Sequence, residues 1–490
     1  MQNGKKGIRI RQDVWKLSNE DPWHPVLLWY ARAVAAMQGR AITDPTSWRY
    51  QAAIHEHFPA NDPLAVSGET LPSLSEQATF WTQCQHDSWF FFPFHRAYLL
   101  YFERIVAEAV RQLGGPADWA LPYWNYSDAT NKDARRLPPA FYASTLPDGT
   151  TNPLRIYKQT LGTETDIPRS PNANKGLDIA TASDVDLSCL LKPQFASSSI
   201  GGQVGFGGPR TWFNHNNGHA GACESRPHGT MHVAVGGPKG WMSSSFTTAG
   251  LDPLFWVHHC NIDRLWEVWL RRSANANPGE PGWRSILTMY FHDADGKAVG
   301  VKSEQLADTT APLLGYEYED VSDPFPGVVT PAAPDPGAVP EMVGATSAPI
   351  VLGASRVTVQ FATTAPLGPA AKSPSPSVHL NLENITAAEG PTESYLVYVN
   401  LPAGIGPEDR PDLEAGIIPL FGVVEASRED RGHRGDGLHY SIDVTSLLRT
   451  AEWNPNSLQV TFVPHERPGV DRAGVGVKTV TVGRVSLYYS

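Results

Sequence analysis

Histidine is the residue type in this 490-residue chain that could do chemistry, because many of its 16 copies gather in three groups. The groups are His55, His86 and His95; His228 and His232; and His258 and His259. Two histidines four residues apart share one face of a helix and can chelate one ion. The spacing therefore predicts metal binding.

The ligand type indicates which metal these groups would hold. Imidazoles without a carboxylate or thiolate suit copper, and three histidines per ion leave positions open for exogenous ligands. A hydrolytic zinc site would more usually include a carboxylate or thiolate, and a structural zinc site would leave no position open. A single histidine such as His55 is more often an ordinary core or surface residue, so the interpretation depends on the whole set.

Two helices are expected to present these histidines to the interior. Apolar residues follow His95 and His259 at spacings of three and four, which predicts helices over 95–110 and 259–270. They are Leu99, Phe102, Val106 and Val110 after the first histidine, and Ile262, Trp266 and Trp269 after the second. Adjacent helical residues point about 100° apart, so only one of His258 and His259 can face the same ion.

A change of composition predicts two domains. Helical periodicity prevails up to about residue 320, and proline, alanine and glycine dominate from Asp323 to Pro349, as in a stiff connector. Short β-branched or alternating runs follow, for example Tyr395 to Leu401 and Leu458 to Val463. We expect a mainly α domain over 1–325, a linker over 326–349 and an all-β sandwich domain over 350–490.

Net charge, the N-terminal residues and the number of cysteines indicate which partners and which location to expect. The net charge is −11 and no long basic run occurs, which argues against nucleic acid or an anionic membrane as partner. The N-terminal residues lack an apolar run long enough for a signal peptide or a membrane span, so we expect a cytoplasmic protein. The four cysteines, Cys84, Cys189, Cys223 and Cys260, are too few for a disulfide framework.

Two segments resemble the copper signatures of the tyrosinase, catechol oxidase and haemocyanin superfamily: His86 to Glu103 and Asp252 to Asp263. The resemblance implies a four-helix bundle that holds two copper ions, copper A and copper B. It implies the ligands His55, His86 and His95 for copper A, and His228, His232 and His259 for copper B. His258 then supports the site without binding copper. His57 is a rival to His55, but the context Gln-Ala-Ala-Ile-His55 fits the family better.

The same resemblance implies roles for three further residues. Glu224 stands where plant-like members keep a carboxylate that holds a water near copper, although it could be an ordinary helix-end carboxylate. Phe246 stands at the position of the bulky gate residue above copper A. Cys84 has the spacing at which relatives join cysteine to histidine by a thioether bond, here to His86; the alternative is a buried free thiol. Tyr316-Glu-Tyr318 resembles the motif that ends the catalytic domain.

Resemblance continues after the linker, where 393–400, 441–448 and 458–464 are similar to the C-terminal domain of plant polyphenol oxidases. This implies a domain that covers the copper entrance and keeps the enzyme latent. The side chain that blocks the entrance is expected between Phe421 and Leu438. The alternative is a domain that only covers an apolar face.

The implied activity is that of a polyphenol oxidase, which oxidises o-diphenols to o-quinones with O2. Its partners would be a small phenolic substrate and O2. Hydroxylation of monophenols stays open, because it depends on the pocket around Phe246, Gly229 and Val233. The alternatives are an O2 carrier of haemocyanin type and an o-aminophenol oxidase.

Overall fold

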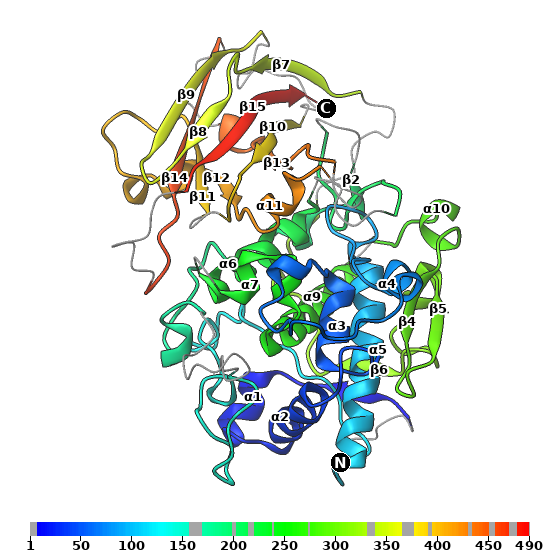
Figure 1. The fold of residues 1–490 in the computed structure, drawn as a ribbon. Coiled ribbons are helices and arrows are strands. Elements are labelled where there is room, and N and C mark those ends of the chain that lie inside the picture. Colours follow the sequence, from blue (N-terminus) through cyan, green and yellow to red (C-terminus); the bar gives the residue numbers. More distant parts are fainter. Residues whose placement is uncertain are drawn as a thin grey trace.

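The computed structural model describes residues 7–155, 169–197, 202–213, 220–237, 240–272, 275–330, 339–364, 377–390, 394–429, 434–449, 456–469 and 478–489. Helices dominate residues 7–330, here called the helical part, and strands dominate residues 339–489, the β part. Figure 1 shows the two parts at opposite ends of the molecule, with α11 (Val423–Ala426) at their junction. This order of helices followed by strands agrees with the prediction.

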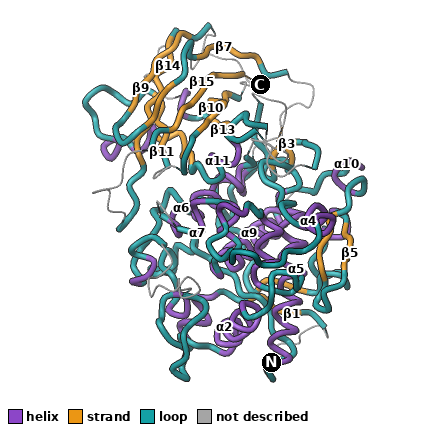
Figure 2. Tube along the Cα trace, in the orientation of Figure 1, coloured by secondary structure: helices purple, strands orange, loops and turns teal. Residues whose placement is uncertain are grey.

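The helical part places most of its helices around one core, and its few strands are short (Figure 2). The helices are α1 (Val14–Glu20), α2 (Pro25–Gln38), α3 (Trp48–His55), α4 (Leu74–Phe80), α5 (Phe91–Gln112), α6 (Thr230–Gly236), α7 (Trp241–Ser244), α8 (Phe246–Ala249), α9 (Pro253–Arg271) and α10 (Pro281–Arg284). The paired strands are β1 (Arg9–Arg11) with β6 (Tyr316–Tyr318), β2 (Ala196–Ser197) with β3 (Gly208–Pro209), and β4 (Met289–His292) with β5 (Ala298–Val301).

The two predicted helices exist and are longer than their apolar spacing indicated. α5 begins four residues before His95, and α9 begins six before His259. Asp252 explains the early start of α9, because its side chain accepts from the Leu254 N–H at 2.9 Å and Pro253 occupies the first helical position. Both helices thus surround their histidines with helical backbone on either side.

Aromatic packing fixes α3, α5 and α9 against one another. The rings of Phe102 on α5 and Trp256 on α9 stack with centroids 3.4 Å apart, and Trp48 on α3 meets both at about 6 Å. All three side chains are buried. These contacts hold the helices that carry His55, His95 and His259 in a fixed relation.

The β part consists of two mainly antiparallel sheets that share one hydrophobic cluster. One sheet has the order β13-β10-β15-β7, with β8 also paired to β15, and the other has the order β12-β11-β14-β9. The strands are β7 (Glu341–Ala345), β8 (Ile350–Leu352), β9 (Val357–Ala362), β10 (Val378–Thr386), β11 (Tyr395–Val399), β12 (Glu414–Ile418), β13 (Leu438–Asp443), β14 (Ser457–Pro464) and β15 (Val480–Tyr489).

The predicted linker is shorter than 326–349. Glu341–Ala345 forms β7 and pairs with β15, so this end of the segment belongs to a sheet. Composition hid the strand, because alanine and glycine are frequent both in β7 and in the connector around it. Residues 331–338 of the predicted linker lie outside the described residues. In the described ranges no helix has the length and apolar character required to cross a bilayer.

Candidate metal centre

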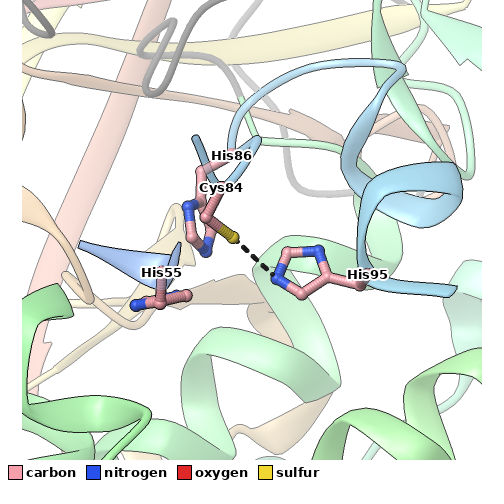
Figure 3. A group of neighbouring side chains, drawn as sticks. All are labelled: His55, Cys84, His86 and His95. Atoms are coloured by element: carbon pink, nitrogen blue, oxygen red, sulfur yellow. Dashed lines mark hydrogen bonds between the residues drawn. The ribbon is translucent and has the colours of Figure 1, made fainter. Parts of the chain in front are cut away.

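The first histidine group forms around the N-terminal end of α5. His55 ends α3, Cys84 and His86 lie in the loop between α4 and α5, and His95 lies in the second turn of α5 (Figure 3). One donor atom from each of the four residues lies within 4.8 Å of the others. All four side chains are buried. A single ion can therefore be reached by all three imidazoles.

The second group forms where α6 meets α9. His228 lies in the π-helical turn Glu224–Gly229, His232 in α6, and His258 and His259 in α9. Their donor atoms also lie within 4.8 Å of one another. The rings of His228 and His232 are 4.6 Å apart, as the four-residue spacing predicts.

Backbone carbonyls orient four of the imidazoles. Each Nδ1 lies 2.7 to 3.0 Å from a carbonyl oxygen: His55 from Phe246, His95 from Phe91, His228 from Glu224 and His232 from Met242. An Nδ1–H that donates to a carbonyl fixes the tautomer and leaves Nε2 as the metal donor. His228 Nε2, which is buried, has no hydrogen-bond partner in the described part of the chain. The donor set therefore fits metal ions.

The two histidine groups are adjacent, and their buried surroundings favour the neutral form of each imidazole. His95 of the first group and His259 of the second stack at 4.3 Å with an angle of 5° between the rings. Burial lowers the pKa of His95 to about 3. Burial, and then neighbouring histidines, hold the pKa values of His228, His232 and His259 well below the usual value. Neutral imidazole is the form that binds metals.

Comparisons with known proteins decide the family. Residues 45–272 match the model of the common central domain of tyrosinase, and residues 339–490 match a domain of unknown function, DUF7868. The chain is 34% identical to tyrosinase HcTyr1 of Hahella sp. (strain CCB-MM4), across 98% of this chain and 99% of that protein. The chain belongs to the tyrosinase family. It is an oxidoreductase of the tyrosinase and catechol oxidase type, and its two histidine groups fit the two copper ions of this family.

Plant polyphenol oxidases match a smaller share of the chain in sequence, but their solved structures match it over its whole length. The chloroplastic polyphenol oxidase of Malus domestica is 28% identical across 60% of this chain and 46% of that enzyme. Among solved structures, latent apple tyrosinase superposes with a TM-score of 0.62 at 23% identity, covering 100% of this chain and 99% of that one. Latent aurone synthase gives a TM-score of 0.63 at 21% identity, covering 100% and 91%. The polyphenol oxidase fold is thus shared over both parts.

The prediction of a cytoplasmic location is wrong, because related enzymes are targeted to an organelle. The related polyphenol oxidases of Malus domestica and Spinacia oleracea are chloroplastic. A transit peptide is removed from the mature protein and leaves no mark on its fold. The N-terminal residues of this tyrosinase-family chain therefore do not give its location.

His57 and His258, the two histidines that are alternatives to the proposed ligands, lie in different surroundings. His57 lies outside both groups and packs on Trp81, with ring centroids 4.4 Å apart. His258 belongs to the second group: its ring stacks on His228 at 5.4 Å, and neither of its nitrogens has a hydrogen-bond partner in the described structure. His259 Nε2 lies 3.4 Å from His232 Nε2. Both members of the pair are therefore close enough to count as donors.

The other predicted site residues lie beside the groups. The Phe246 ring stacks on His86 at 4.3 Å and meets His55 at 5.2 Å. Glu224 is buried, and its carboxylate accepts from the N–H groups of Asp87 at 2.7 Å and Gly221 at 3.4 Å. Burial, and then Asp87, raise the pKa of Glu224 well above its usual value.

Cys84 is close to both His86 and His95, as Figure 3 shows. Its sulfur lies 3.1 Å from His95 Nε2. Burial, and then Glu224, raise the pKa of the Cys84 thiol well above its usual value. A neutral thiol is therefore favoured in the protein without copper.

Sequence reasoning did not name the side chain of the β part that reaches the site. Phe421, at the start of the predicted segment, stacks on His232 at 3.9 Å with an angle of 11° and meets Phe246 at 4.9 Å. Pro419 and Tyr440 line the same pocket. Residues 430–433 of that segment lie outside the described ranges. No periodicity singles out Phe421, because a residue in a loop contributes to no repeating pattern.

Proposed function

We propose that this tyrosinase-family protein is a polyphenol oxidase that oxidises o-diphenols to o-quinones with O2. The observation that carries the proposal is the pair of adjacent, buried imidazole groups with a pocket against them. Bound copper supplies the redox chemistry between the diphenol and O2. Two o-diphenols give up four electrons and four protons to one O2, which yields two o-quinones and two waters.

We assign His55, His86 and His95 to copper A, and His228, His232 and His259 to copper B. The carbonyl-oriented Nδ1 atoms support four of the six assignments. The match of Asp252–Asp263 to the family signature supports His259 over His258. His258 then fills the space behind His228, on which it stacks.

Two residues of the pocket have proposed roles in handling the phenol. Phe246 covers His86 with its ring and would hold the aromatic ring of a substrate by stacking and edge contacts. Glu224 would hold a water and, as the carboxylate, accept a proton, because burial raises its pKa and so makes the carboxylate a stronger base. The free space beside it suits a water but is too small for a phenol ring.

Phe421 explains that lack of space, and we propose that it keeps the enzyme latent. Its ring occupies the place beside His232 that a substrate ring would need. The close fit continues at Gly229, where an added Cβ would lie 2.9 Å from Pro419, and at Gly422, where it would lie 2.5 Å from the Phe246 ring. The apple tyrosinase and aurone synthase structures of the same fold are described as latent forms.

Architecture and domain limits complete the proposal. The helical segments that carry the ligands, namely α3, α5, α9 and α6 with the turn before it, would form the four-helix bundle of the family. The two sheets of the β part would form a sandwich around their common cluster. Given β7, a catalytic domain to about residue 325 and a β domain from about residue 339 fit best.

Metal content and product formation test the proposed function. The copper-loaded full-length chain and its Phe421→Ala variant are compared for O2 uptake and quinone absorbance with 4-methylcatechol. We expect two copper ions per chain and quinone formation that His95→Ala abolishes. Reversible O2 binding without quinone in the Phe421→Ala chain would instead indicate an O2 carrier.

A further inference from the structure

Asp87 brings a second carboxyl group to the pocket beside the metal centre. It follows His86 in the loop before α5, and 5% of its surface is exposed. Its backbone has a φ of 53°, a conformation that aspartate and asparagine adopt more readily than most residues. In this conformation its N–H donates to Glu224 Oε1. Asp87 and Glu224 therefore line one wall of the pocket together.

The carboxyl group of Asp87 shares this pocket with Glu224 and Tyr440. No lysine or arginine is among the described residues that line the pocket. Among the described residues, a substrate substituent that enters this space meets two carboxyl groups and no lysine or arginine.

We propose that Asp87 determines substrate specificity, so that the pocket selects phenols with an ammonium-bearing substituent over phenols with a carboxylate. This rests on the proposed phenol oxidation. An ammonium group gains a counter-charge at this wall, whereas a carboxylate adds a further negative charge to it. One partly solvated ion pair changes binding by about fivefold. The charge of bound copper acts equally in parent and variant, so a comparison of the two isolates Asp87.

The test uses the copper-loaded, full-length Phe421→Ala chain with and without Asp87→Asn. Asparagine keeps the size, the backbone N–H and the tolerance for a positive φ, and removes only the charge. The measured quantity is kcat/KM for dopamine, for 4-methylcatechol and for 3,4-dihydroxyphenylpropionate. The matched control is Asp295→Asn, which removes one negative charge at an exposed residue paired with Lys297.

We expect Asp87→Asn to lower the dopamine to 4-methylcatechol ratio about fivefold and to raise the propionate ratio, and Asp295→Asn to leave both ratios as they were. Equal ratios with and without Asp87→Asn would overturn the proposal, as would a loss common to all three catechols. Calorimetric binding of tyramine and 4-hydroxyphenylpropionate to the metal-free Phe421→Ala chain gives a second readout. If no catechol is oxidised, the proposed function fails, and this binding difference still decides the role of Asp87.

Discussion

At the scale of single residues, the two adjacent histidines of α9 contact different residues of the metal centre. His259 Nε2 lies 3.4 Å from His232 Nε2 and its ring stacks on His95, whereas the His258 ring stacks on His228. His259→Ala should therefore remove a ligand and cost about one of the two copper ions per chain, as measured by elemental analysis. His258→Ala should keep both ions and lower activity about tenfold, the usual effect of losing a supporting contact. Equal copper loss in the two variants would make His258 a ligand.

Cys84 carries a second prediction at this scale. The thiol and the His86 ring belong to one buried group with donor atoms within 4.8 Å. In the copper-loaded enzyme the sulfur should bond to a ring carbon of His86, with the two hydrogens and two electrons passing to O2. Peptide mapping should find the peptide that contains both Cys84 and His86 lighter by two hydrogens, and three of the four cysteines alkylated after unfolding. Four alkylated cysteines in active enzyme would exclude the bond.

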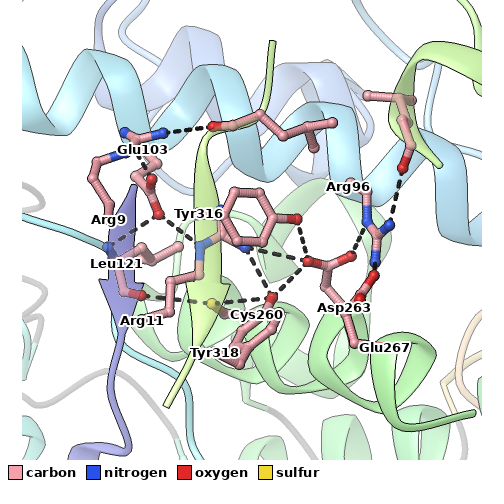
Figure 4. A network of polar contacts seen from close by, with 12 residues as sticks. Arg9, Arg11, Arg96, Glu103, Leu121, Cys260, Asp263, Glu267, Tyr316 and Tyr318 are labelled. Atoms are coloured by element: carbon pink, nitrogen blue, oxygen red, sulfur yellow. Dashed lines mark hydrogen bonds and ion pairs between the residues drawn. The ribbon is translucent and has the colours of Figure 1, made fainter. Parts of the chain in front are cut away.

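At the scale of elements, a buried polar network joins β1, β6, α5 and α9 (Figure 4). Asp263 on α9 accepts from Arg96 on α5 at 2.6 Å, from Arg11 on β1 at 3.2 Å and from the Tyr316 and Tyr318 hydroxyls at 2.5 Å. Glu103 binds Arg11 at 2.8 Å. Arg96 is next to His95, and Asp263 is four residues after His259. The network therefore sets the relative position of two proposed copper ligands.

Replacing the central carboxylate should destabilise the whole helical part. Asp263→Asn leaves two buried guanidinium groups without their shared counter-charge, which costs about 3–5 kcal/mol. Urea unfolding of the metal-free protein measures this, with exposed Asp295→Asn as control. Burial acts to raise the pKa of Asp263, but Arg96 and Arg11 hold it below the usual value. Its contribution is therefore full above pH about 4 and is lost as pH falls through the lowered value. A difference of less than about 1 kcal/mol would show that the network is not structural.

Elements with a chemical or periodic signature were predictable, and contacts between distant elements were not. The two histidine groups stood out because only a few residue types bind such ions, and α5 and α9 stood out through their apolar spacing. β7 was missed because an edge strand of five residues in a segment rich in alanine and glycine has no marked alternation. The sequence did not point to Asp87, because its place in the pocket depends on contact with Glu224, which is 137 residues away in the chain.

At the scale of the whole molecule, a charged contact joins the two parts. Asp184 of the helical part is fully buried and accepts from His465 at 3.1 Å and from Arg467 at 2.7 and 3.0 Å, both in the β part. Its backbone oxygen accepts from Thr230, which lies between His228 and His232. Burial opposes ionisation of Asp184, but Arg467 and His465 hold its pKa below the usual value.

Asp184→Asn should therefore loosen the β part and raise catechol turnover severalfold without any cleavage. Asp186→Asn is the matched control, because Asp186 lies in the same loop and pairs with Arg226 of the helical part. A depressed pKa means that the contact is complete above pH about 4 and is lost only as pH falls through the lowered value. Turnover assayed after brief exposure to pH 5 should thus match that of untreated enzyme. Equal turnover of Asp184→Asn and Asp186→Asn would show that this contact does not maintain latency.

The last prediction separates the connector from the contacts that hold the β part in place. Cutting within 326–349 breaks the chain, but Phe421 on His232, Arg467 on Asp184 and Arg428 on Glu56 still join the two parts. A nicked enzyme should therefore stay latent until mild detergent or separation removes the β part.

Phe421→Ala in the uncut chain should raise catechol turnover by about tenfold or more, because it frees the space beside His232 while those charged contacts remain. Val424→Ala, at a half-buried neighbour on α11, is the matched control and should leave the enzyme latent. Quinone formation by nicked, separated and Phe421→Ala enzyme, each with its copper content measured, decides the matter. A separated helical part that is folded, holds two copper ions and is no more active than the intact chain would show that the β part serves stability alone.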